Sequence, residues 1–506
     1  MKYIYTYIVL FSMLLTSCGD WLNIQPKSEV TSENLYNNAD GYRSALVGLY
    51  LGMSEESLYG SNMTLTQMEY LANSIRAYYM PDPGAVPTLY QLNNFIIHLG
   101  ERNNLIENVF SNIWSKAYGV VANCNYFLRQ LENQDAGLFE PGVKEVMLGE
   151  AYAIRAYLHF DMMRLFHYPY GDPNGKTAKC VPYVTEFGLA LSESLTSDQI
   201  MDKALEDLEK AESLMKETDP AITGKQYFDR YFGRNRQFKM NYFAVRALMA
   251  RIYLQKQEYG KAFEHSTFVL DNASRMSARM ANAIDLEAKD ANFSGLPYNR
   301  SFPMENIFAV YSENLDNVVN GSFSNTAPTA GRLQLNRSFV TDYCNDPRDI
   351  RRSAWAYPLT GSRNYLMKFV RPTLEGEINK YPLPSIPLIK LGEMYLIAAE
   401  SALNDQASGG IAEAVRIMNE FRNNRGVDQL AGQTAETLNS EIKKQYYTEF
   451  IGEGQIFFFY KRINSPNIPN VLAKEFAQPL DKPMTVKNYT PDIPMAEVVG
   501  GRQPIN

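Results

Sequence analysis

The sequence is short of the side chains that build most metal and nucleophilic sites. Its 506 residues include only four histidines, and its four cysteines are widely spaced, at Cys18, Cys124, Cys180 and Cys344. No C-x-x-C pair occurs, so the spacing indicates neither a zinc site nor a disulfide framework. The H-E-x-x-H, G-x-S-x-G, Walker and dinucleotide-binding glycine patterns are absent as well. We therefore expect neither a metal nor a cofactor.

Basic charge and tryptophan are also scarce. The 49 Lys and Arg are outnumbered by 56 Asp and Glu, which leaves a net charge of −7, so the composition argues against nucleic acid or anionic lipid as a partner. Three tryptophans accompany 34 tyrosines and 26 phenylalanines. Tyrosine joins a flat apolar face to a polar tip, which suits wet recognition surfaces, although many of these rings are expected in the core. With 45% hydrophobic and 21% charged residues, the composition is that of a globular protein.

The N-terminus has the features of a secretion signal. A single basic residue, Lys2, precedes an apolar run from Tyr3 to Leu15, which is shorter than the roughly 20 residues that a membrane-spanning helix needs. The run leads into Leu-Thr-Ser-Cys-Gly, which resembles a bacterial lipobox. We predict that residues 1–17 are a signal peptide, that Cys18 is lipidated, and that residues 18–31 form a tether. The alternative is a plain cleaved signal with an incidental cysteine.

The clearest helical hairpin spans residues 387–426. Pro387 is expected in the first turn of a helix that runs to Asn404. A narrow polar arc with apolar residues elsewhere predicts packing neighbours on several sides; its members are Lys390, Glu393, Glu400, Ser401 and Asn404. Small residues, Gly392 among them, favour close approach of a second backbone. A second helix ends at Gly426, which suits a C-cap. The unit has the size of a tetratricopeptide-type repeat, although periodicity alone equally allows an ordinary helical hairpin.

The rest of the chain combines long helical stretches with irregular ones. Helices are expected at residues 103–133 and 143–166, from Ser197 to about Thr218, in a hairpin over 239–272, and as one helix over 438–462. Residues 54–100 and 273–381 lack periodicity, and 464–506 is a proline-rich coil. The pattern predicts an all-α fold: a domain of residues 32–506 with tetratricopeptide-like hairpins at about 103–166, 198–272 and 387–426. A large irregular portion at 273–381 is expected to bind ligand, and residues 438–506 complete the chain.

Two acidic groups are candidates for chemistry. Asp342, Asp346 and Asp349 are close enough in sequence to bind calcium, but the segment lacks the glycine and terminal glutamate of an EF-hand, so a capped turn is the favoured interpretation. Glu449 and Glu453 are spaced i, i+4 and would present two carboxylates on one helix face, as a glycosidase requires. Because basic residues lie nearby, structural ion pairing is favoured over catalysis; these are Lys443, Lys444, Lys461 and Arg462.

Several stretches together resemble the SusD/RagB family of outer-membrane nutrient-uptake lipoproteins. The lipobox cysteine with its short tether is similar to the start of that family, and the match covers nearly the whole chain. The stretches that carry the resemblance are LGEAYAIRAYLHFDMMRLFHYPYGD (148–172), ALMARIYLQKQEYGKAFEHSTFVL (247–270), ENIFAV (305–310), IPLIKLGEMYLIAAESAL (386–403), EFIGEGQIFFFYKR (449–462) and DIPMAEV (492–498). Departures occur where the family carries structural charge pairs, at Gln445, Tyr446, Tyr447, Gln455 and Phe459.

The resemblance implies an α-helical body of four tetratricopeptide-like hairpins that supports a loop-rich ligand face. It further implies a lipid-anchored protein on the exterior of the outer membrane, which binds an oligosaccharide without cutting it. The implied partner is a SusC-like TonB-dependent outer-membrane transporter, which such a protein caps like a lid. A peptide ligand in the same machinery is an alternative, and a glycosidase that uses Glu449 and Glu453 is a further, less favoured one.

Sugar binding needs aromatic faces beside polar side chains, because a pyranose stacks its C–H face on a ring while its hydroxyls need donors and acceptors. Three segments supply both, at 76–90, 290–300 and 355–365. The residues predicted to contact the ligand are Arg76, Tyr78, Tyr79, Tyr298, Trp355 and Tyr357. The alternative for any of these aromatic residues is that it packs its own loop. Trp114, on a long helix, is expected in the core.

Overall fold

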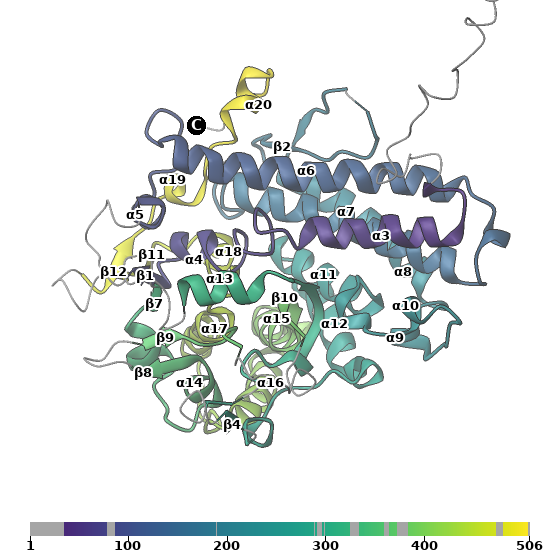
Figure 1. Cartoon of the computed structure of the whole chain (residues 1–506). Helices are drawn as coiled ribbons and strands as arrows, with labels where there is room; N and C mark the ends of the chain where they lie inside the picture. Colours follow the sequence, from purple (N-terminus) through teal and green to yellow (C-terminus); the bar gives the residue numbers. More distant parts are fainter. Residues whose placement is uncertain are drawn as a thin grey trace, which may run out of the picture. The chain divides into compact units, whose positions relative to one another are not determined.

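The computed structural model describes residues 35–77, 87–188, 190–287, 289–290, 296–297, 299–323, 333–358, 364–371, 383–471 and 479–503 (Figure 1). Two compact units divide the chain between Ala45 and Leu46. The described part of the smaller unit contains the start of helix α3 (Ala39–Met53), and the larger unit contains the elements that follow. The predicted signal peptide, Cys18 and the tether lie outside the described residues.

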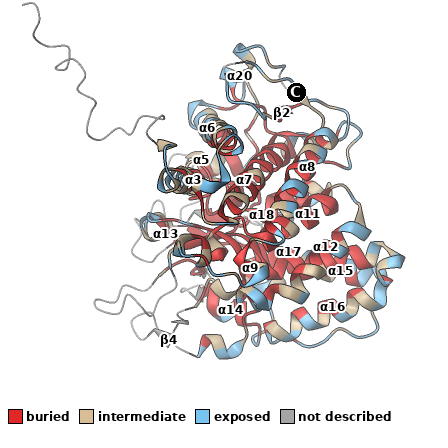
Figure 2. Cartoon of the chain, turned by 90° about the vertical axis from the view of Figure 1, so that its right-hand side faces the viewer, coloured by how far each residue is buried: buried red, intermediate tan, exposed pale blue. Residues whose placement is uncertain are grey.

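The first predicted hairpin is formed by α6 (Asn104–Glu132) and α7 (Val143–Phe166), which run side by side in Figure 1. Asn103 caps α6, because its side chain accepts hydrogen bonds from the backbone N–H groups of Leu105 and Ile106. Trp114 is buried on α6, as expected. Helix α7 is buried along almost its whole length (Figure 2), because α6 and α8 (Ser197–Met215) both pack against it.

A second hairpin, α11 (Tyr242–Gln255) and α12 (Tyr259–Asn272), corresponds to the predicted repeat at 239–272. Between α8 and α11 the chain forms the short helices α9 (Pro220–Thr223) and α10 (Arg230–Gly233). Arg236 ties this connection to α7 by an ion pair to Glu150 (2.6 Å), and within the connection it pairs with Asp219, the cap of α9, at 2.8 Å. Helix α11 packs against both α8 and α12, so the hairpins form a continuous array.

The third hairpin begins later than the sequence predicts. Pro387 lies in strand β10 (Ser385–Lys390), not in a first helical turn, and α15 starts at Leu391 and ends at Asn404. The reason is tertiary: β10 pairs antiparallel with β6 (Asn306–Tyr311). Helix α16 (Gly410–Arg425) ends as expected at Gly426, whose φ is +76°.

Helix α15 is surrounded, as its apolar circumference predicts, because α11, α12, α16 and α17 (Ala435–Phe450) all contact it. Even the carboxylates Glu393 and Glu400 of its polar arc are buried. The small residue Gly392 admits a charged group rather than a second backbone. A Cβ at this position would lie 2.8 Å from a carboxylate oxygen of Glu449 and 3.3 Å from the Arg425 guanidinium.

The single helix expected over 438–462 is two helices, α17 and α18 (Gln455–Arg462). They are separated by a turn in which Gly452 and Gly454 have φ values of +76° and +71°. At Gly454 a Cβ would collide with the backbone of Met63 and Thr64. The break is therefore set by contact with a distant segment, which helical periodicity does not reveal.

Short strands and helices make up the irregular portions. Residues 54–100, whose sequence lacks periodicity, hold α4 (Gln67–Leu71), β1 (Ile75–Ala77) and α5 (Pro87–Asn93). The tail contains β11 (Asn467–Pro469), β12 (Asp481–Pro483), α19 (Val486–Tyr489) and α20 (Met495–Val499). The remaining elements are β2 (Val181–Pro182), β3 (Ser194–Leu195), β4 (Lys289–Asp290), β5 (Leu296–Pro297), α13 (Leu315–Ser322), β7 (Leu333–Leu335), α14 (Ile350–Trp355), β8 (Ala356–Pro358) and β9 (Asn364–Leu366). Within the described ranges, no helix combines the length and the apolar character needed to cross a bilayer.

Candidate functional site

The structure brings together the described strands of the three predicted ligand segments, although these segments are far apart in the sequence. Strand β1 pairs antiparallel with β7, β7 contacts β9, and β9 pairs with β8. Helix α14 leads directly into β8 and also contacts β5. The strands β1, β7, β9 and β8 follow one another down the left side of Figure 1. We call these strands, with β5 and α14, the loop face.

Arg76 joins the first two strands of the loop face. It lies opposite Gln334 in the register of β1 and β7, and its Nη2 donates a hydrogen bond to Gln334 Oε1 at 2.8 Å. Its exposed fraction is 2%, so in this conformation the guanidinium braces the strand pair. Its assignment as a ligand contact stays a prediction.

Trp355 lies at the base of the loop face with no exposed surface. Its indole N–H donates to the Arg300 carbonyl oxygen at 2.6 Å, which fixes the end of α14 to the segment that follows β5. The Phe302 ring packs against it at 5.2 Å between centroids, and the Lys368 ammonium lies 3.8 Å from its ring centroid. Here the indole supports the loops and offers no face to a sugar; its role as a ligand contact stays a prediction.

The other predicted contacts are tyrosines in or beside the loops. Tyr78, Tyr79 and Tyr298 lie outside the described residues. The backbone of Tyr357 belongs to β8, opposite Tyr365 of β9, but its side chain lies outside the described part. In the sequence, each of these four residues lies in or within two residues of a strand of the loop face, and their contact with ligand stays a prediction.

A buried network of charges lies behind the loop face. Glu449 is paired with Arg425 at 2.7 Å and with Arg351 at 3.1 Å, while Arg425 also pairs with Glu305 at 2.6 Å. Lys390 lies 3.5 Å from Glu305 and 3.7 Å from Glu449. These five side chains are at most 1% exposed. They come from α14, α16, α17, β10 and the turn before β6, so the network joins the hairpins to the irregular half.

Lys368 connects this network to Trp355. Its ammonium pairs with Glu453 at 2.7 Å and donates to the carbonyl oxygens of Glu449 and Ile451 at 2.8 and 3.2 Å. Burial lowers the pKa of Lys368 to about 8, although the Glu453 carboxylate favours the charged form. The ammonium therefore holds the α17–α18 turn and the Trp355 ring in one arrangement.

Both carboxylates considered for glycosidase chemistry are held in ion pairs of this network. Glu449 and Glu453 are buried and form structural ion pairs, as favoured from the sequence. Their partners, however, are Arg351, Arg425, Lys368 and Lys390, not the neighbouring basic residues. Burial alone would raise the pKa of Glu449, but the charges of Arg425, Lys390 and Arg351 hold it well below its usual range. Such a group does not serve as a general acid near neutral pH.

The acidic segment at 342–349 forms a capped turn, the interpretation favoured over calcium binding. Asp349 accepts a hydrogen bond from the backbone N–H of Arg351 at the start of α14 and pairs with that arginine at 2.7 Å. Asp346 pairs with Arg348 at 2.8 Å. Among the residues with described positions, no cluster of three or more His, Cys, Asp or Glu side chains is arranged to hold a metal ion.

Sequence reasoning missed the residues that support the loop face. Gln334 and Lys368 belong to no motif, and Arg300 was included only as the last residue of the predicted segment 290–300. One signal was available for Lys368, because it is the single charge within the apolar run Leu366–Val370. A charged residue inside such a run is expected to find a buried partner.

Two sequence families match the chain in separate stretches. Residues 67–254 match a family described as "Starch-binding associating with outer membrane", and residues 322–495 match one described as the SusD family. Together these stretches include the hairpins α6–α7, α11–α12 (in part) and α15–α16, as well as most of the loop face.

Individual proteins that resemble this chain also carry SusD names. SusD-like protein P2 of Formosa agariphila is 25% identical over 287 residues, which is 55% of this chain and 48% of that protein; the match spans about half the length of this curated relative. A SusD superfamily protein of Bacteroides thetaiotaomicron has a similar structure, with a TM-score of 0.69 and 21% identity over 93% of this chain and all of that one. The structure of a SusD-like carbohydrate binding protein of Bacteroides vulgatus is also similar, with a TM-score of 0.66 and 15% identity. The alignment covers 91% of this chain and 96% of that one. The two structures share the fold of this chain.

Proposed function

We propose that the chain is a member of the SusD family, because family models match residues 67–254 and 322–495, and that it binds a nutrient oligosaccharide at the loop face without breaking a bond. We further propose that it delivers this ligand to a SusC-like TonB-dependent transporter in the outer membrane. The observation that carries the proposal is the convergence of β1, β5 and β8 at one face. These strands border the tyrosine-bearing segments, and a rigid charged base lies behind them.

Non-catalytic binding agrees with the state of the carboxylates. Glu449 and Glu453 are buried and already paired with basic side chains, so neither is free to protonate a glycosidic oxygen or attack an anomeric carbon. Aromatic stacking with a polar rim binds a sugar without such groups.

The proposal is tested by calorimetric titration of the purified chain with a panel of oligosaccharides. We expect binding that weakens at least tenfold in the double variant Tyr79→Ala/Tyr298→Ala, because each ring would supply a stacking face. Phe228→Ala is the matched control, since Phe228 is 97% exposed and lies before α10, away from the loop face. Equal affinities for the wild type, the double variant and the control would contradict the assignment of the site.

A peptide ligand is the competing assignment for the same face. The same titration with a panel of short peptides separates the two. Peptide binding that depends on Tyr79 and Tyr298, with no saccharide binding, would replace the oligosaccharide by a peptide and leave the machinery unchanged. Release of reducing ends by the purified chain would overturn the non-catalytic assignment altogether.

Attachment to the membrane is proposed to depend on Cys18. A lipid on this thiol would anchor the chain through the tether at 18–31 to the outer membrane, facing the exterior. Cys18→Ala is therefore expected to move the protein from the membrane fraction to the soluble fraction. Cys344→Ala is the control, because Cys344 is buried in the larger unit. Unchanged fractionation of Cys18→Ala would exclude the lipid anchor.

A further inference from the structure

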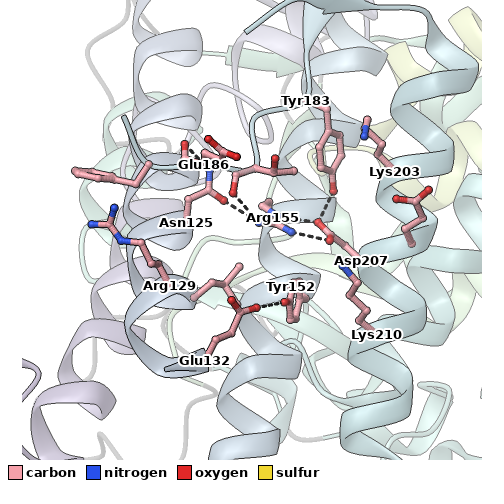
Figure 3. A pocket seen from close by; sticks show the side chains of 14 residues that line it. Asn125, Arg129, Glu132, Tyr152, Arg155, Tyr183, Glu186, Lys203, Asp207 and Lys210 are labelled. Carbon is pink, nitrogen blue, oxygen red and sulfur yellow. Dashed lines mark hydrogen bonds and ion pairs between the residues drawn. The ribbon is translucent and has the colours of Figure 1, made fainter. Parts of the chain in front are cut away.

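A cavity separate from the loop face lies among α6, α7 and α8 of the larger unit (Figure 3). It has a volume of about 540 Å³ and opens between α6 and α8, with α7 beneath it. Volumes of this size are typical of small-molecule sites. None of the elements of the loop face contributes to its lining, which consists of Asn125, Leu128, Arg129, Glu132, Tyr152, Arg155, Tyr183, Thr185, Glu186, Phe187, Lys203, Glu206, Asp207 and Lys210.

The floor of the cavity is a saturated ion pair. Arg155 donates from Nε and Nη2 to the two carboxylate oxygens of Asp207, both at 2.7 Å, and from Nη1 to Asn125 Oδ1 at 2.9 Å. The Tyr183 hydroxyl donates to the same carboxylate at 2.6 Å. Because Arg155 and Asp207 are buried and fully bonded, they hold α6, α7 and α8 in a fixed arrangement and prepare the floor before any ligand arrives.

His159 holds the wall that follows β2. Its Nδ1–H donates to the Arg155 carbonyl oxygen at 2.9 Å, and its Nε2 accepts from the backbone N–H of Val184 at 2.8 Å. The imidazole also stacks on the Tyr183 ring at 3.9 Å between centroids. The segment 183–187 is thereby attached to α7, which places Glu186 and Phe187 at the rim.

The rim carries charged groups that form no ion pair within the described residues, although Arg129 lies over the Phe187 ring (5.4 Å) and Lys210 over the Tyr152 ring (5.3 Å). Lys203 and Lys210 lie seven residues apart on one face of α8, and Arg129 faces them from α6 (Figure 3). Glu186 and Glu206 add two carboxylates. None of these five side chains forms an ion pair with a residue that the structure describes. In contrast, Asp207 and Glu132 are engaged by Arg155 and by the Tyr152 hydroxyl.

The lining selects the class of ligand. Four basic and four acidic side chains balance one another, so the cavity does not favour a strongly charged ligand. Donors and acceptors both line it, together with the rings of Tyr152, Tyr183 and Phe187. A sugar ring carries many hydroxyl groups and has apolar C–H faces, so it needs polar side chains and aromatic rings side by side. We propose that the cavity is a second saccharide site, for a short neutral saccharide, separate from the loop face.

A neighbouring groove provides room for a longer chain. It has a volume of about 630 Å³ and shares Glu132, Tyr152, Glu206 and Lys210 with the cavity. Its other lining residues continue along α7 and α8, at Leu148, Glu209, Ser213 and Leu214. A saccharide that extends beyond the cavity would therefore leave along the groove between these two helices.

The test uses the full chain carrying Tyr79→Ala/Tyr298→Ala, so that binding at the loop face does not mask the second site. Titration with a panel of neutral mono- and oligosaccharides is expected to show binding in this background. Adding Lys203→Met and Lys210→Met removes two donors at the rim and should weaken it about tenfold. Lys216→Met is the matched control, because Lys216 is an exposed lysine just beyond α8 that lines neither cavity nor groove.

The possible outcomes separate this proposal from the function proposed above. Saccharide binding that is lost only with the lysine substitutions supports the second site, whatever happens at the loop face. Absence of neutral-saccharide binding in the Tyr79→Ala/Tyr298→Ala background overturns it, as does binding that the lysine substitutions leave unchanged. Binding of the dipeptide Ala-Ala, lost in Lys203→Met/Lys210→Met while no saccharide binds, would also overturn the ligand class.

Discussion

Glu449 is the residue on which the buried charges behind the loop face converge. It contacts Arg351, Arg425 and Lys390, all without solvent access. A buried ion network adds little net stability over an apolar core, but removing one partner leaves uncompensated charge in a medium that solvates it poorly. The space for this carboxylate beside α15 exists because residue 392 is glycine.

Glu449→Gln keeps the shape of the side chain and removes its charge. We expect it to lower the free energy of unfolding by about 3–5 kcal/mol, measured by urea denaturation. Glu413→Gln is the matched control, because Glu413 pairs at the same distance of 2.7 Å with Arg416, which is 61% exposed; its loss should stay below about 1 kcal/mol. Similar losses in the two variants would show that the network is not the source of the effect.

The turn between α17 and α18 is the element whose geometry depends most on a distant contact. Gly452 and Gly454 both have positive φ, and Gly454 is packed against the backbone of residues 63 and 64. The turn also carries Glu453, the partner of Lys368. Its shape therefore couples the helices to the base of the loop face.

Gly454→Ala is expected to destabilise the chain more than a positive φ alone explains. A left-handed conformation costs a non-glycine residue about 1–2 kcal/mol, and the added methyl group would also displace the Met63–Thr64 backbone. Gly432→Ala is the control, since Gly432 has φ of +62° and open space around its Cβ position. In thermal unfolding, Gly454→Ala should therefore lower Tm well below the value for Gly432→Ala. Equal Tm values would contradict the packing argument.

At the scale of the whole molecule, ion pairs and hydrogen bonds between helices join the hairpins. Arg251 of α11 pairs with Glu393 of α15 at 2.6 Å, and Lys461 of α18 donates to the Leu165 carbonyl oxygen of α7 at 2.8 Å. The loop face and the cavity among α6, α7 and α8 are built on separate elements of this array.

Buried titratable groups make the stability of this array depend on pH between 5 and 7. Burial, with a contribution from Lys461, lowers the pKa of His167 to about 3. As the pH falls below about 6.5, the His167 imidazole is protonated in the unfolded chain but stays neutral in the folded chain, so the free energy of unfolding decreases. Burial raises the pKa of Glu69 to about 7. The folded state takes up that proton first, so this group opposes the histidine and adds stability as the pH falls from 7.

The two groups are separated by substitution. Between pH 7 and pH 5 the free energy of unfolding should fall by about 2 kcal/mol less in His167→Leu than in the wild type. Neither ring nitrogen of His167 has a hydrogen-bond partner among the described residues, so the substitution breaks no such bond. Glu69→Gln should show a larger loss than the wild type. Thermal unfolding at both pH values measures the differences, and parallel curves for all three proteins would refute the assignment.

The sequence by itself determined the helices whose signals are local. The Asn103 cap of α6 and the glycine at the end of α16 each act within a turn of the helix that they bound. Apolar periodicity placed α7, α11 and α12, because burial of one face requires that spacing whatever the partner. The motifs also sufficed for the resemblance to the SusD family, since they are read from adjacent residues.

Only the tertiary structure decided features that depend on partners far along the chain. Pro387 is in a strand because β6, about 80 residues earlier, offers its edge. Trp355 is buried because Arg300 and Phe302 lie beside it, and Glu449 is paired with basic residues from α14, β10 and α16 rather than with its neighbours. Such pairings follow from how the elements pack, and the free energy of burying a charge or a ring is set by that packing, which the local sequence does not contain.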